Sequence, residues 1–80
     1  MDISMKQKRI SELVAWIAKK PVNIGTDESL FESGLLDSFA LTDLVSALEK
    51  EYNIHVPDGD LNPRKFDTLD KIAEYIEAKQ

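Results

Sequence analysis

Residues 34–52 read GLLDSFALTDLVSALEKEY, and they predict a loop that runs directly into an amphipathic helix. We expect this helix to span about residues 38–52, because its apolar residues recur at the i, i+3, i+4 and i+7 spacing of one buried face. Ser38 then lies in the first turn, where backbone N–H groups lack intrahelical acceptors and the helix dipole is positive. Such an end can hold an anion, for example a phosphodiester. The residues of the buried face are Leu41, Leu44, Val45, Leu48 and Tyr52.

Asp37 and Ser38 also have a simpler interpretation. Both are common N-cap residues, and either side chain can do no more than accept a hydrogen bond from a backbone N–H group. An Asp-Ser pair at a helix start therefore does not by itself indicate a chemical site, and the longer sequence context has to decide.

Two further segments show the same apolar spacing, and we expect helices over about residues 4–19 and 68–77. Ser4 opens a capping box for the first of them, and Thr68 is a suitable N-cap for the last. A short third helix is expected to begin at Asn62-Pro63, since proline suits the first helical position. The apolar positions of the two long helices are Ile10, Leu13, Val14, Ile17, Leu69, Ile72, Ala73 and Ile76.

The connection over residues 21–36 is long for a small domain, and connections of this length are usually functional or packed by their own side chains. We expect Leu30, Phe31 and Leu35 to plug the bundle. Gly34 is expected to allow the turn that presents the serine at the start of the next helix.

No segment alternates well enough to be a strand, so the sequence predicts an all-α fold. We expect a small four-helix bundle with three long helices and one short helix, in a single domain over residues 1–80. Trp16 borders the apolar side of the first helix. Its expected role is that of an aromatic side chain packed at the edge of the core, with no part in binding a ligand.

Charge is unevenly spread along the chain, whose net charge is −5. Residues 1–20 hold five basic and two acidic side chains, whereas residues 21–40 hold four acidic and no basic ones. Residues 41–60 hold five acidic side chains and one lysine. A surface so acidic around Ser38 excludes nucleic acid as a partner and favours basic patches on other proteins.

The absence of cysteine excludes disulfides and cysteine-based zinc sites, and it means that any thioester must use a thiol brought from outside. No apolar run is long enough to cross a bilayer, and the N-terminal residues do not resemble a secretory signal. We therefore expect a cytoplasmic, monomeric protein that does not bind membranes.

Catalysis by the chain itself is not expected. His55, the single histidine, lies beyond the far end of the helix that Ser38 starts, roughly 20 Å away, and so cannot act as its base. The oxygen-rich run that starts at Asp58 is no calcium loop, because Pro63 stands where glycine is needed and Leu69 where glutamate is needed. We expect no metal site.

An ordered set of motifs resembles the acyl and peptidyl carrier proteins. The set covers roughly residues 27–77 and includes Leu30-Phe31-Glu32, Gly34-Leu35-Leu36-Asp37-Ser38, Leu44-Val45, Ala47-Leu48-Glu49, Tyr52-Asn53-Ile54-His55-Val56-Pro57 and Thr68-Leu69-Asp70-Lys71-Ile72. The resemblance implies that Ser38 carries 4′-phosphopantetheine, which a phosphopantetheinyl transferase takes from coenzyme A. It also implies that Asp37 helps to place the magnesium ion of that transfer, and that the terminal thiol then receives an acyl or aminoacyl group as a thioester.

The resemblance further implies that the helix after Ser38 recognises partners. Asp43 and Glu49 match acidic positions of that surface, whereas Lys50 departs from an often acidic one. Phe39, Leu41, Leu44 and Ile54 lie where they can contact the arm, its cargo or a docking enzyme, although core packing is at least as good an explanation for Leu41 and Leu44.

The implied partners are the transferase, an acyl- or aminoacyl-adenylating ligase and downstream acyl-transfer enzymes of a fatty-acid, polyketide, lipid or specialised pathway. Leu36, Phe39 and residues 61–68 resemble specialised stand-alone carriers, including D-alanyl carrier proteins, more than the usual fatty-acid type. The competing hypothesis is a helical adaptor that is never modified and that binds basic partners through its acidic second helix.

Overall fold

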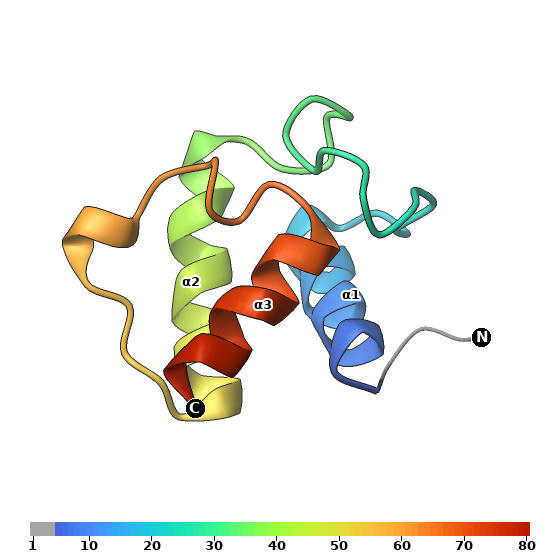
Figure 1. Cartoon of the computed structure of the whole chain (residues 1–80). Coiled ribbons are helices and arrows are strands. Elements are labelled where there is room, and N and C mark those ends of the chain that lie inside the picture. The colour runs from blue at the N-terminus through green and yellow to red at the C-terminus, as the bar shows by residue number, and fades with distance from the viewer. Residues whose placement is uncertain (1–4) are drawn as a thin grey trace.

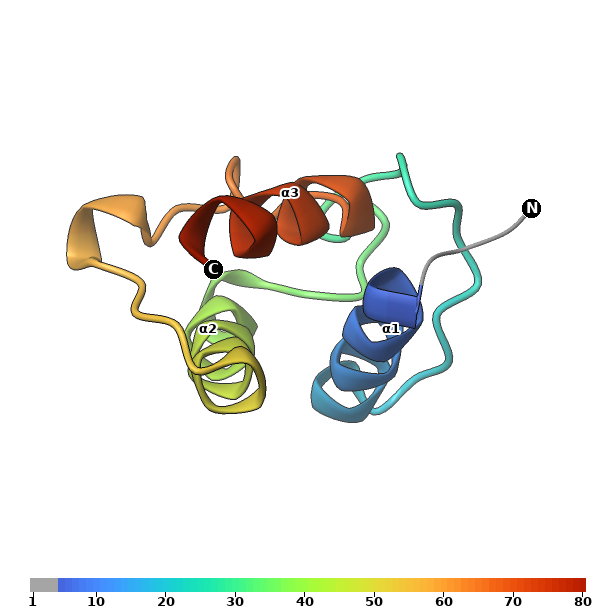
Figure 2. The same cartoon turned by 60° about the horizontal axis from the view of Figure 1, so that its bottom comes forward.

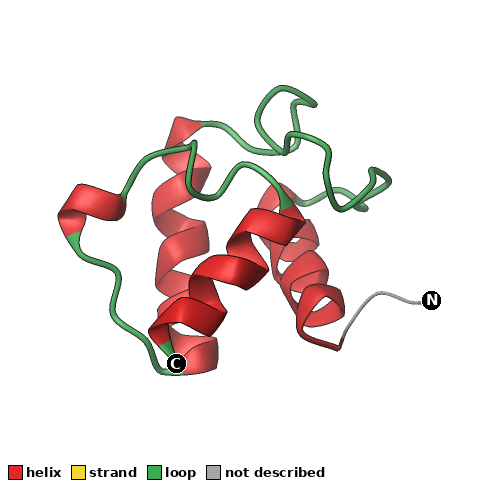
Figure 3. Cartoon of the chain, in the orientation of Figure 1, coloured by secondary structure: helices red, strands yellow, loops and turns green. Residues whose placement is uncertain are grey.

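The computed structural model describes residues 5–80, which form three α-helices and one 3-10 turn (Figures 1 and 3). The α-helices are α1 (Met5–Ala18), α2 (Ser38–Tyr52) and α3 (Leu69–Lys79), and the 3-10 turn η1 spans Asp58–Asp60. No strand occurs in this part of the chain, so the prediction of an all-α fold is confirmed there. None of the helices within residues 5–80 has the length and apolar character that a bilayer crossing requires.

The three helices form two layers. α1 and α2 lie side by side and run in opposite directions, and α3 crosses over them (Figures 1 and 2). α1 packs against both of the others. The core is made of the inward-facing positions of all three helices together with side chains from the two long connections. These buried residues are Ile10, Val14, Leu30, Leu36, Leu41, Leu44, Val45, Leu48, Val56, Phe66, Leu69, Ile72, Ala73 and Ile76.

The prediction for α2 matches the structure at both ends, and α3 runs two residues beyond its expected end. Thr68 caps α3 as predicted, because its Oγ1 accepts a hydrogen bond from the Lys71 backbone N–H at 3.0 Å. The expected capping box at Ser4 lies outside the described residues.

The short helix expected at Asn62-Pro63 is not formed, so the count of four helices is not confirmed. The chain turns there instead, with Phe66 N–H donating to the Pro63 carbonyl at 3.3 Å. The Asp67 carbonyl then accepts a hydrogen bond from Leu30 N–H at 2.6 Å. The Thr68 backbone is extended, and its side chain caps α3. Directly after this turn the chain is held extended, so no helix continues from it.

The connection between α1 and α2 is packed, as its apolar content predicts. Leu30 is completely buried, and Phe31 and Leu35 pack against the core while partly exposed. Leu36, which was not assigned this role, is buried as well. Gly34 has φ +88°, a backbone conformation that L side chains rarely adopt, so the predicted turn does require glycine.

Trp16 does not pack at the edge of the core, so the prediction for it is wrong. Its side chain is 76% exposed. It lines a groove between α1 and α2 where Ser46 and Ala47 stand on the α2 side. Side chains as small as these do not cover an indole ring, and the periodicity of α1 alone carries no information about them.

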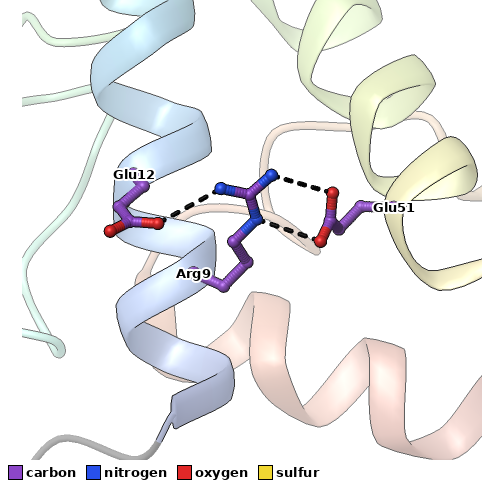
Figure 4. A network of polar contacts seen from close by, with 3 residues as sticks. All are labelled: Arg9, Glu12 and Glu51. Carbon is purple, nitrogen blue, oxygen red and sulfur yellow. Dashed lines mark hydrogen bonds and ion pairs between the residues drawn. The ribbon is translucent and has the colours of Figure 1, made fainter.

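The two antiparallel helices are joined by an ion pair at the end of α2 that lies away from Ser38. Arg9 of α1 donates from Nε and Nη2 to the two carboxylate oxygens of Glu51, both at 3.0 Å, and from Nη1 to Glu12 at 3.2 Å (Figure 4). These hydrogen bonds lower the pKa of Glu51 and raise that of Arg9. The two-pronged contact links α1 to α2 at the protein surface.

Candidate functional site

The start of α2 is fixed by Asp37. Its backbone is extended, with φ −124° and ψ −179°, and its side chain accepts a hydrogen bond from the Ala40 backbone N–H at 2.8 Å. Its carbonyl accepts the first intrahelical bond, from Leu41 N–H at 3.2 Å. Asp37 is therefore the N-cap, and Ser38 is the first residue of the helix.

Ser38 and Phe39 are both exposed, and the Phe39 side chain is 85% accessible. The Asp37 side chain satisfies the N–H of Ala40, and the N–H groups of Ser38 and Phe39 are among the others at this helix start that have no intrahelical acceptor. The site thus combines an exposed serine, backbone N–H donors of the first turn and the positive end of a 15-residue helix. These features fit a phosphodiester on the hydroxyl oxygen.

The segment before Ser38 is held by contacts with the start of α3. Leu30 N–H donates to the Asp67 carbonyl at 2.6 Å, and the Ser29 hydroxyl donates to the Asp67 carboxylate at 2.5 Å. Leu36 N–H closes the segment on the Leu30 carbonyl at 3.0 Å. These bonds hold the backbone that leads into Asp37 against the body of the protein.

Sequence reasoning missed this support. The Ser29 hydroxyl also accepts Glu32 N–H at 3.0 Å, and a serine three residues before a glutamate is a readable local signal of such a turn. No local signal identifies Asp67, because its partners lie almost 40 positions away in the sequence.

The predicted partner-binding residues are dispersed along α2. Asp43 is exposed, one and a half turns beyond Ser38. Leu41 is only 6% exposed and belongs to the core. Glu49 and Ile54 lie at the opposite end of the helix and are partly buried. The structure therefore brings together Asp37, Ser38 and Phe39, with Asp43 nearby, and separates them from the others.

Glu49 has a structural role that the sequence did not reveal. Its carboxylate accepts Val56 N–H at 2.8 Å and lies 3.6 Å from His55 Nδ1. His55 is thus engaged beyond the far end of α2, as expected, and is remote from Ser38. Within residues 5–80 no group of acidic and histidine side chains is arranged to hold a metal ion.

Comparisons with known proteins agree with this geometry. A family model described as a phosphopantetheine attachment site matches residues 8–76. A D-alanyl carrier protein of Leuconostoc mesenteroides is 31% identical over 72 residues, which cover 90% of this chain and 92% of that relative. A D-alanyl carrier protein of Streptococcus pyogenes serotype M5 is 31% identical over 74 residues, which cover 92% of this chain and 94% of the relative. The chain therefore belongs to the family of carrier proteins that bear covalently attached 4′-phosphopantetheine.

Proposed function

We propose that Ser38 is the attachment residue and that the chain carries acyl or aminoacyl groups as thioesters between partner enzymes. The observation that carries this proposal is the exposed position of Ser38 as the first residue of α2, within the span of the family match. Other exposed serines, such as Ser33 and Ser46, lack a helix N-terminus of this length and an aspartate N-cap.

In the attachment reaction the Ser38 oxygen attacks the β-phosphorus of coenzyme A. A serine O–P bond forms, the P–O bond of the diphosphate breaks, and adenosine 3′,5′-bisphosphate leaves with the electron pair while the hydroxyl proton passes to a base of the transferase. The positive end of α2 stabilises the negative charge of the new phosphodiester. Asp37 caps the helix throughout, and its carboxylate would help to bind the magnesium ion of the transfer.

The cargo that we propose is a small aminoacyl group, with D-alanyl as the first candidate. The two relatives described above, which match over nine tenths of the chain, are D-alanyl carrier proteins. The partners would be a phosphopantetheinyl transferase and an aminoacyl-adenylating ligase, and the carrier would act as a monomer in the cytoplasm. Because the chain has no cysteine, the thiol that holds the cargo must come from the attached arm.

Intact-mass analysis tests the proposal. The protein is incubated with a broad-specificity phosphopantetheinyl transferase, coenzyme A and Mg²⁺, and one phosphopantetheinyl group should be added. Ser38→Ala should remain unmodified, whereas Ser46→Ala, an exposed serine further along the same helix, should be modified at the normal rate. A wild-type chain that stays unmodified would support the adaptor hypothesis instead.

The modified protein also allows a test of the cargo. With ATP and a D-alanine-adenylating ligase it should gain one D-alanyl group that hydroxylamine releases, as expected for a thioester. Modification without loading by this ligase would support attachment at Ser38 and exclude D-alanyl as the cargo.

A further inference from the structure

Three hydrogen bonds join the loop before α2 to the start of α3. Leu30 N–H donates to the Asp67 carbonyl at 2.6 Å, and Asp70 N–H donates to the Thr26 carbonyl at 3.0 Å. The Ser29 hydroxyl donates to the Asp67 carboxylate at 2.5 Å. The first two bonds use backbone atoms, whereas the third depends on two side chains. The Ser29–Asp67 contact can therefore be removed by substitution without deleting either partner of the two backbone bonds.

The Ser29–Asp67 contact supports the backbone that enters Asp37. Leu36 N–H donates to the Leu30 carbonyl at 3.0 Å, so the two ends of the loop segment between these residues are held together. Leu30 is completely buried, and Leu36 is only 4% exposed. Because Leu36 directly precedes Asp37, the anchor at Leu30 also holds the backbone that enters the N-cap.

The N-cap contact itself lies at the surface. Asp37 and Ser38 are exposed, and so is the hydrogen bond from Ala40 N–H to the Asp37 carboxylate. Leu41 is the first buried residue of α2. Helix ends fray, and they do so more readily when the cap is lost. The first turn of α2 is therefore held between two buried residues, Leu36 and Leu41, and the position of Leu36 depends on the loop.

We propose that Ser29 and Asp67 are positioning residues for the modification of Ser38, an inference that rests on the proposed function. Their contact keeps Asp37 at the N-cap, so the first turn of α2 stays wound while the Ser38 hydroxyl meets the transferase. A nucleophile held in one orientation reacts faster than one that samples several. Ser29 and Asp67 act through the loop backbone and touch none of the reacting atoms.

A purely structural role for the contact predicts a different result. A contact that only stabilises the fold lowers the free energy of unfolding when it is lost, and the folded protein remains as good a substrate as before. Loss of a positioning contact lowers the kcat of the transferase at saturating carrier. The KM for the carrier changes little, because the exposed face of α2 beyond the first turn keeps its shape. The split between kcat and KM therefore distinguishes the two roles.

Steady-state kinetics of the full-length chain with a phosphopantetheinyl transferase, coenzyme A and Mg²⁺ test the proposal. Urea titrations first identify conditions in which every variant is folded. Ser29→Ala and Asp67→Ala should each lower kcat about tenfold, with KM for the carrier within about twofold of the wild-type value. The double variant should be no slower than either single variant, because all three lack the same contact.

Conservative variants should restore the rate. Ser29→Thr keeps the hydroxyl, and Asp67→Asn keeps an oxygen that can accept its hydrogen bond. Both should keep kcat within about twofold of the wild-type value. Asp67→Asn also removes one negative charge from a hollow that acidic side chains mainly line. A normal rate for this variant would therefore assign the effect to the hydrogen bond and not to the charge.

Two control variants separate this contact from its surroundings. Ser33→Ala makes the same chemical change in the same loop, at a hydroxyl that donates within the loop to the Leu30 carbonyl at 3.0 Å. Ile76→Val removes one methyl group from the buried face of α3, and it lowers stability without changing the loop. Both variants should show the kcat of the wild type.

Amide hydrogen exchange gives a readout that does not need the transferase. Ala40 N–H donates to the Asp37 carboxylate and Leu41 N–H to the Asp37 carbonyl, so both exchange when the first turn opens. Ser29→Ala should speed both exchanges several-fold, and Ile76→Val should not.

A normal kcat in Ser29→Ala would overturn the inference, and so would a loss of kcat that Ser33→Ala or Ile76→Val shares. Asp67→Asn as slow as Asp67→Ala would also overturn it, as would unchanged exchange in the first turn. A wild-type chain that stays unmodified would contradict attachment at Ser38, whereas the exchange measurement would still test the loop contact. The two failures are therefore distinguishable.

Discussion

The Asp37 carboxylate accepts a hydrogen bond from the Ala40 backbone N–H at 2.8 Å, and this contact fixes Ser38 as the first residue of α2. The same contact satisfies one of the four orphan N–H donors at this helix start, whereas the N–H groups of Ser38 and Phe39 have no intrahelical acceptor. One aspartate thus sets both where the helix begins and which groups face an incoming phosphate.

Replacing Asp37 separates its capping role from its charge. Asp37→Ala removes the cap and should lower the free energy of unfolding by about 1 kcal/mol in urea titrations, whereas Asp37→Ser, a good cap without charge, should retain most of the stability. Asp37→Ser should nevertheless be modified more slowly by the transferase at limiting Mg²⁺. Equal modification rates for Asp37→Ser and the wild type would show that the carboxylate does nothing more than cap the helix.

Gly34 should be sensitive to substitution for backbone reasons alone. A Cβ added there would meet no atom within 4 Å, yet φ is +88°, so Gly34→Ala should destabilise the protein by about 1 kcal/mol. Gly59→Ala is the matched control, because a Cβ there also meets open space and no positive φ is involved. It should be neutral or slightly stabilising in the same thermal denaturation assay. If Gly34→Ala and Gly59→Ala lost similar amounts of stability, the positive φ of Gly34 would not be the cause of the loss.

Substitutions at Phe39 and Leu41 should distinguish a residue that contacts partner enzymes from one that packs in the core. Phe39 is 85% exposed, so Phe39→Ala should change the free energy of unfolding by less than about 0.5 kcal/mol while slowing modification or loading. Leu41 is 6% exposed, and Leu41→Ala should cost about 2–5 kcal/mol through the cavity that it leaves. Denaturation curves and transferase kinetics on both variants check this. A Phe39→Ala variant with normal kinetics would exclude contact between this ring and the partner enzymes that were tested.

Stability should depend on pH through the contact between Asp60 and Tyr75. The Tyr75 hydroxyl donates to the Asp60 carboxylate at 2.7 Å. Burial and this bond raise the pKa of Tyr75 to about 12, and the bond lowers the pKa of Asp60. The contribution of Tyr75 to the free energy of unfolding is fully present below its ordinary pKa of 10 and is lost as pH rises towards 12. The contribution of Asp60 to the free energy of unfolding is present above its ordinary pKa of 3.8 and is lost as pH falls below that value.

Tyr75→Phe should therefore reduce the loss of stability at both extremes when urea midpoints are measured against pH. Tyr52→Phe is a control for the alkaline side, since burial also raises the pKa of Tyr52. It should likewise reduce the alkaline loss of stability. If Tyr75→Phe and the wild type lose the same amount of stability at acid pH, the assigned role of Asp60 is contradicted.

The parts of the fold that the sequence predicts correctly are those set by local signals. Both ends of α2 follow from an aspartate cap and an apolar stripe that ends at Tyr52, and α3 begins at its threonine cap. The exposed serine at the head of α2 follows from the same pattern. Each of these features depends on residues within a few positions of one another.

The errors arise where distant residues decide. The chain turns at residues 62–66 and is then fixed by Asp67, whose backbone carbonyl accepts a hydrogen bond from Leu30 N–H and whose carboxylate accepts one from the Ser29 hydroxyl. Trp16 is exposed because the facing residues of α2 are small. The apolar spacing of one helix does not show which residues will face it. That depends on how the helices pair in the folded chain.

Tandem mass spectrometry of the modified protein shows directly whether Ser38 carries the phosphopantetheinyl arm. After reaction with the transferase and coenzyme A, the proteolytic peptide that spans Asp37 to Ser46 should carry one phosphopantetheinyl group, and its fragments should place that group on the Ser38 oxygen. Localisation to Ser33, Ser46 or any other residue, or modification of Ser38→Ala to the same extent as the wild type, would contradict attachment at Ser38.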